Sequence, residues 1–140
     1  MNFILDTNVI SELVAARPNL NVIEWIQATD SDRIFLSVIS IGEIKKGIEK
    51  LPNSDRKVIL DHWLQEDLLA QFTDQLLSID VQTMLIWGKL VSQLEKLGRP
   101  ISAIDALLAA TAQQWGFTLV TRNTVHFQDT GINLLNPWDK

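Results

Sequence analysis

The stretch FILDTNVISEL, residues 3–13, decides the fold of this chain. Its first three residues are apolar and too few for a helix, which is typical of a strand buried on both faces. Asp6 follows at once, and apolar residues then recur at helical spacing at Val9, Ile10 and Leu13. The stretch predicts a strand, a tight turn and a helix, with an acid at the corner where α/β proteins place their binding sites. Asp6 could also do no more than cap that helix.

Four further apolar runs have the length and composition of buried strands, and helical patterns separate them. They span residues 34–38, 76–79, 117–120 and 132–135. No hairpin signal joins two of them, so the strands should pair in parallel with right-handed crossovers. The predicted fold is α/β, a three-layer α/β/α sandwich with a mainly parallel five-stranded sheet. No repeat, low-complexity tract or linker divides the chain, so we expect a single domain over residues 1–140.

Composition limits the compartment and the partners. The chain is 46% apolar and 21% charged, as in ordinary soluble globules, and lacks both a signal-type segment and an apolar stretch of ~20 residues. We therefore expect a cytoplasmic protein with no membrane contact. It contains no cysteine, which excludes disulfides and thiolate metal sites. The net charge of −5 argues against a general polyanion binder, unless an acidic site holds cations that meet phosphates.

Three acids share one position relative to the predicted strands. Asp6 follows the first strand, Glu43 lies in the first helical turn after the second, and Asp105 lies in the first turn of the helix before the fourth. Carboxylates that converge repel one another, so either one is protonated or a cation is bound. Oxygen ligands without His or Cys select hard ions, which makes Mg²⁺, or else Mn²⁺, the expected cofactor. Such ions bridge to phosphate oxygens and activate water, so the pattern predicts phosphodiester hydrolysis.

Helix caps use the same residue types, so each acid has a structural alternative. Ser40 and Glu43 have the spacing of a capping box, and so do Ser102 and Asp105. For Asp105 we favour a functional role, because apolar residues at i−4, i+3 and i+4 place it on the face that packs against the sheet. A carboxylate directed inward requires a positive or hydrogen-bonding partner. Asp80 follows the third strand and opens a long helix, and there we favour a cap.

Five segments, in order along the chain, carry a resemblance to a known family. They are LDTNVISEL (5–13), SIGEIKKG (40–47), PISAIDALLAATA (100–112), LVTRN (119–123) and NPW (136–138). The chain resembles the PIN-domain proteins of the VapC toxin family, including its FitB-like branch. The resemblance implies a PIN-like fold and a magnesium-dependent endoribonuclease, the toxin of a type II toxin–antitoxin system. It also implies an RNA substrate, a homodimer and inhibition by a cognate antitoxin protein.

The resemblance assigns roles to particular residues and shows one departure. The family's metal-binding acids correspond to Asp6, Glu43 and Asp105. At the fourth corner, Asn123 stands where the family commonly has an acid, and His126 replaces the usual Asp before a Phe. Asn123 keeps an oxygen ligand, so we expect it among the catalytic residues and expect one metal site to remain. Asp129 nearby is expected to be a solvated loop residue.

Two other interpretations stay open at this stage. A receiver domain or a haloacid-dehalogenase-type phosphatase would also use Mg²⁺, but either would need a second acid near Asp6, and Asn8 stands at the phosphatase position. The other interpretation is a PIN fold retained for binding alone, which would act in a repressor complex with its antitoxin and cleave nothing.

A basic cluster follows Glu43 and predicts either a docking face or a solvated helix surface. Its members, five of the twelve basic residues, lie within residues 45–57: Lys45, Lys46, Lys50, Arg56 and Lys57. If the cluster guides RNA or antitoxin, it offsets the acidic total close to the predicted site.

Overall fold

The strands and helices alternate along the chain, as the sequence pattern predicts. The computed structural model describes residues 1–139, and Lys140, the last residue of the predicted domain, lies outside this range. The strands are β1 (Phe3–Leu5), β2 (Ile34–Ser37), β3 (Leu76–Leu77), β4 (Thr118–Val120) and β5 (Leu134–Leu135). Within residues 1–139 they form one five-stranded sheet in the order β3-β2-β1-β4-β5, and all neighbours are parallel. The predicted parallel sheet is confirmed.

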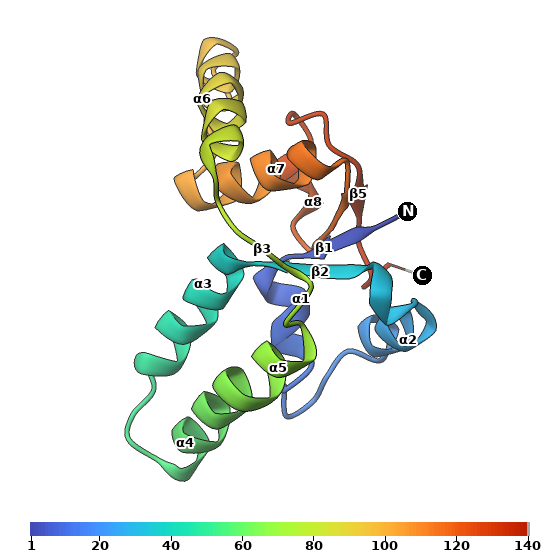
Figure 1. Ribbon diagram of the computed structural model, residues 1–140, viewed down its shortest axis with the longest axis vertical. Helices are drawn as coiled ribbons and strands as arrows, with labels where there is room; N and C mark the ends of the chain where they lie inside the picture. The colour runs from blue at the N-terminus through green and yellow to red at the C-terminus, as the bar shows by residue number, and fades with distance from the viewer. Residues whose placement is uncertain (140) are drawn as a thin grey trace.

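Helices cover both faces of the sheet, which gives the three predicted layers (Figure 1). One face carries α1 (Thr7–Glu12), α2 (Leu20–Ala28), α3 (Val38–Glu49), α4 (Asp55–His62) and α5 (Leu69–Gln71), with a 3₁₀ turn, η1 (Ser31–Arg33), and a π-helical stretch, η2 (Trp63–Leu68). The other face carries α6 (Val81–Lys96), α7 (Ala103–Trp115) and α8 (Thr124–Phe127). No helix within residues 1–139 is long and apolar enough to cross a membrane.

Each central strand contributes to a core on both sides of the sheet. Ile4 and Leu119 pack in the core beneath α6 and α7, whereas Leu5 and Val120 pack in the core beneath α1, α3 and η2. All four side chains are at most 1% exposed. Successive strand residues point to opposite faces, so burial on both sides explains why these strands are continuous apolar runs.

The ends of the two longest helices match the sequence signals. Asp80 caps α6, because its Oδ1 accepts a hydrogen bond from the Thr83 backbone N–H at 3.0 Å and the Thr83 hydroxyl accepts one from the Asp80 N–H at 3.2 Å. Gly98 follows α6 and Gly116 follows α7 with φ of 68° and 69°. Glycine adopts this left-handed conformation without the steric penalty of a side chain, so both helices end there.

The capping box predicted at Ser40 is wrong. Helix α3 begins at Val38, directly after β2, and the Ser37 hydroxyl accepts a hydrogen bond from the Ile39 N–H at 3.1 Å. Ser40 is therefore fully buried inside the helix. Glu43 lies in the second turn of α3 rather than the first, so its side chain has no capping duty.

Candidate active site

Asp6 lies at the carboxyl end of β1 and is the most buried acid of the predicted site, with 7% of its surface exposed. Its Oδ1 accepts a hydrogen bond from the Thr7 N–H at 2.7 Å, which caps α1. Its Oδ2 accepts one from the Thr121 hydroxyl at 2.8 Å. Asp6 therefore caps α1 with one carboxylate oxygen and has a hydrogen-bond donor for the other. The two hydrogen bonds fix the direction of the carboxylate.

Glu43 reaches the same corner from α3. Its Oε1 accepts a hydrogen bond from the Thr7 hydroxyl at 2.7 Å. Thr7 thus joins the two acids, because its N–H binds Asp6 and its hydroxyl binds Glu43. The contact holds the start of α1 against α3 and keeps Glu43 near enough for its charge to act on Asp6.

Asp105 approaches from the first turn of α7, where Ser102 is the N-cap and accepts a hydrogen bond from the Asp105 N–H at 3.2 Å. The Asp105 carboxylate is half-buried, and its Oδ2 lies 3.9 Å from Nδ1 of His126 on α8. The backbone of Asp105 therefore belongs to the helix cap, while its side chain faces the corner where α7 and α8 meet. His126, which replaces the family's usual Asp, therefore lies beside this acid.

The end of β4 closes the site with uncharged side chains. The buried Thr121 hydroxyl donates to Asp6, and accepts from the Asn123 N–H at 3.0 Å and from Asn8 Nδ2 at 3.5 Å. Asn8 Oδ1 accepts from the Arg122 N–H at 3.3 Å. Asn123 is exposed and begins α8 without a side-chain capping bond. These contacts tie the β1–α1 corner to the β4–α8 corner.

The charges of the three acids act on one another. Burial raises the pKa of Asp6 above its ordinary value, the hydrogen bonds from Thr121 and Thr7 oppose this shift, and the charges of Asp105 and Glu43 raise the pKa further. Within residues 1–139 no three carboxylate or imidazole groups are placed so that they could hold a metal ion as they stand. The support for a divalent cation is therefore the type of the ligands and not their present geometry. The three carboxylates repel one another, and a hard cation would relieve that repulsion.

Comparison with known proteins identifies the family. The PIN-domain family matches residues 3–133. The chain belongs to the PIN-domain family. It is 34% identical to VapC ribonuclease Y4jK of Sinorhizobium fredii over 136 residues, 97% of either chain, and 33% identical to Toxin FitB of Neisseria gonorrhoeae over 135 residues, 96% of this chain and 97% of that one. The crystal structure of FitAcB from Neisseria gonorrhoeae matches with a TM-score of 0.94 and 33% identity, over 99% of each chain.

The PIN-domain site contains two hydroxyl residues to which sequence reasoning gave no role. Thr7 joins Asp6 to Glu43, and Thr121 supports Asp6 from the end of β4. Thr121 directly follows a predicted strand and Thr7 follows one by two residues, and those positions were the available signal. Asp129 is an exposed turn residue, as expected, and forms an ion pair at the surface with Arg99, whose Nη1 lies 3.1 Å from Oδ1. It therefore gives the PIN-domain site no additional acid.

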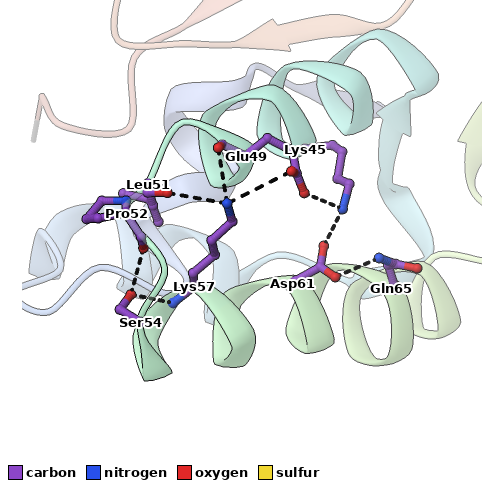
Figure 2. A network of polar contacts seen from close by, with 8 residues as sticks. All are labelled: Lys45, Glu49, Leu51, Pro52, Ser54, Lys57, Asp61 and Gln65. Atoms are coloured by element: carbon purple, nitrogen blue, oxygen red, sulfur yellow. Dashed lines mark hydrogen bonds and ion pairs between the residues drawn. The ribbon is translucent and has the colours of Figure 1, made fainter.

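Two members of the basic cluster of this PIN domain, Lys45 and Lys57, form polar contacts between α3 and α4 (Figure 2). Lys45 Nζ lies 2.9 Å from Glu49 and 2.7 Å from Asp61, which links α3 to α4. Lys57 Nζ donates to the carbonyl oxygens of Glu49 at 3.2 Å and Leu51 at 3.3 Å, at the C-terminal end of α3. These two lysines contribute to the α3–α4 packing, which leaves three members of the cluster without such contacts within residues 1–139: Lys46, Lys50 and Arg56.

Proposed function

We propose that this protein is a magnesium-dependent endoribonuclease that acts in the cytoplasm as the toxin of a type II toxin–antitoxin system. The observation that carries the proposal is the buried Asp6 carboxylate, whose pKa is raised by burial and also by the charges of Glu43 and Asp105. A divalent cation relieves that repulsion and is drawn to the phosphates of RNA. The similarity to VapC ribonuclease Y4jK and Toxin FitB supports the activity and the role.

In this proposal Asp6, Glu43 and Asp105 hold the ion. When bound, Mg²⁺ or Mn²⁺ supplies positive charge for the phosphate oxygens and makes water a better nucleophile. Thr121 and Thr7 fix the directions of the Asp6 and Glu43 carboxylates. Carboxylates that are already oriented lose less conformational freedom when a substrate complex forms. In this proposal the two hydroxyls position the carboxylates and take no part in the reaction itself.

The fourth corner carries less negative charge than the other three. Asn123 offers a neutral oxygen, and His126 places an imidazole 3.9 Å from Asp105. Neither adds a carboxylate that a second hard cation would require. We therefore propose that the site holds a single ion. Asn123 lies just beyond the end of β4, two residues after the buried Thr121, and in this proposal it contacts the substrate.

The proposed partner is a cognate antitoxin protein. On α4, Val58 and Ile59 are 70% and 65% exposed. Neighbouring exposed aliphatic side chains on one helix favour a protein contact, because water disfavours them. Membership of the VapC family supports an antitoxin as the protein that covers such a surface.

The first prediction is that the protein, purified free of antitoxin, cleaves RNA in Mg²⁺ or Mn²⁺ and leaves it intact in EDTA. Asp6→Asn and Asp105→Asn should abolish cleavage, because each removes one of the negative charges that hold the ion. Asp74→Asn makes the same charge change at an exposed loop residue and should cleave normally.

Gel electrophoresis of labelled cellular RNA measures this outcome. Undiminished cleavage in EDTA would refute the metal-dependent mechanism. If no cellular RNA is cut with any divalent metal, the binding-only interpretation of the PIN fold replaces the nuclease.

A further inference from the structure

A hollow of about 450 Å³ lies between α3 and α7, directly beside Glu43. Its α3 wall is a single helical stripe, in which residues recur at i, i+1, i+4, i+5 and i+8. The stripe, here called the α3 stripe, consists of Gly42, Glu43, Lys46, Gly47 and Lys50. Val38, Ile79 and Ile104 add apolar surface to the hollow and are 37–42% exposed.

The two lysines of the α3 stripe differ from the other lysines of the basic cluster. Lys45 and Lys57 are held by Glu49 and Asp61, but within residues 1–139 neither Lys46 nor Lys50 forms an ion pair. Lys46 and Lys50 follow Glu43 by three and seven residues, roughly 4 and 10 Å along the helix axis. A polyanion that reaches Glu43 along α3 would therefore meet two uncompensated positive charges on a protein of net charge −5.

Neither the backbone conformation nor the packing of the fold requires glycine at the two glycine positions of the α3 stripe. Glycine inside a helix is destabilising relative to alanine. Neither Gly42 nor Gly47 has a positive φ, and a Cβ added at either one would meet no atom within 4 Å. The chain itself therefore does not require them, and their effect is to open the surface of α3 to close approach by another molecule.

We infer that the α3 stripe is the binding track for the single strand of RNA that leads to the proposed cleavage site. Lys46 and Lys50 bind consecutive parts of the phosphate backbone, and the glycines let that backbone lie close to α3. The unpaired bases of a single strand can contact Val38 and Ile104, whereas a duplex keeps its bases stacked inside. The inference rests on the proposed function for the place of cleavage, but binding itself requires no cleavage.

The charge test measures the fluorescence anisotropy of a fluorescein-labelled oligouridine over a series of salt concentrations in EDTA. Lys46→Glu and Lys50→Glu should each weaken binding and flatten the dependence of log K on log salt by about 0.7, the value for one phosphate contact on a single strand. Lys89→Glu makes the same charge change at an exposed position of α6 and should retain the wild-type slope. Equal slopes for all four proteins would overturn the inference.

The glycine test separates access from stability. Gly42→Ala and Gly47→Ala should raise Tm, because alanine favours the helix, and should weaken oligouridine binding. Gly88 of α6 also has no atom within 4 Å of an added Cβ, so Gly88→Ala should raise Tm and leave binding unchanged. Wild-type binding by the α3 variants would overturn the inference. If the α3 variants change only their sedimentation and not their oligouridine binding, the inference would also be overturned, because the α3 stripe would then be a contact with a second copy of the chain.

Electrophoresis of the oligouridine recovered from each titration, and from a parallel sample in Mg²⁺, reports cleavage separately. Binding that depends on the α3 stripe, by a protein that cuts neither the oligouridine nor any cellular RNA with a divalent metal, would support the track and refute the proposed nuclease. Cleavage in Mg²⁺, together with binding that the α3-stripe substitutions do not change, would support the nuclease and refute the binding track.

Discussion

At the scale of single residues, the site depends on hydroxyl groups as much as on acids. The Thr121 side chain is fully buried, and its hydroxyl is the shared partner of Asp6, Asn8 and the Asn123 backbone. A hydrogen bond to a buried carboxylate partly compensates the loss of hydration. This explains how Asp6 can be both a helix cap and a charged group inside the fold, two roles that looked like alternatives in the sequence.

The raised pKa of Asp6 predicts how its neutralisation affects stability. Because the folded pKa lies above the ordinary 3.8, ionised Asp6 destabilises the fold, and this penalty develops as pH rises from about 3.8 through the folded pKa. Asp6→Asn cannot ionise and keeps an oxygen to accept from the Thr7 N–H. In EDTA at neutral pH the variant should therefore be at least as stable as wild type, and this advantage should disappear at acid pH.

Urea denaturation at several pH values, in EDTA and in Mg²⁺, measures this effect. Mg²⁺ should stabilise the wild type and not the variant, since a ligand stabilises only the state that binds it. Lower stability of Asp6→Asn in EDTA at neutral pH would show that the cap and the Thr121 contact outweigh the cost of burial.

At the scale of secondary-structure elements, the start of α6 shows an acid used only for structure. The Asp80 carboxylate accepts hydrogen bonds from Thr83, and Gln114 Nε2 donates to both of its oxygens, at 3.1 and 3.2 Å. Gln114 belongs to α7, so the cap of one helix also fastens the next. The hydrogen bonds from the Thr83 backbone and side chain hold the pKa of Asp80 below its ordinary value.

This lowered pKa gives Asp80→Ala the opposite signature to Asp6→Asn. The stabilisation by ionised Asp80 is present above the unfolded pKa of about 3.8 and is lost as pH falls through the lower folded pKa. Asp80→Ala should therefore melt a few degrees below wild type at neutral pH, equally in EDTA and Mg²⁺, and the difference should shrink in strong acid. Cleavage by the folded fraction should be retained. A variant that melts like wild type but fails to cleave would contradict the assignment of Asp80 to the cap.

At the scale of the whole molecule, an exposed apolar stripe on α6 fits the homodimer implied by the family. Val81, Met84 and Leu85 are 76%, 42% and 64% exposed, and their i, i+3, i+4 spacing places them side by side. Aliphatic side chains grouped on one helix face favour association, because burial removes them from water.

We therefore predict that the protein sediments at twice its 15.8 kDa mass. Leu85→Lys should shift it toward the monomer, since a buried, unpaired ammonium opposes association. Val58→Lys changes a comparably exposed residue on α4 and should leave the mass unchanged. Analytical ultracentrifugation distinguishes the outcomes, and a wild type that sediments as a monomer at all concentrations would rule out the dimer.

The sequence by itself determined the elements and the corners where they meet. Continuous apolar runs predict strands buried on both faces, and the cap at Asp80 and the stop at Gly116 depend on residues only a few positions apart. The acids after β1 and at the start of α7 were found in the same way. The start of α3 was misjudged by three residues, because Ser37 and Ser40 are both capable caps and only the end of β2 selects between them.

Tertiary structure alone decided which groups support the acids. Thr121 lies 115 residues from Asp6, Thr7 lies 36 from Glu43, and Lys45 lies 16 from its partner Asp61. Such pairs form only because parallel strands bring their carboxyl ends to one edge of the sheet and because α4 folds back on α3. Local patterns predict a residue's own element, but a hydrogen bond between distant side chains depends on how the packed layers align, and no short stretch of sequence contains that information.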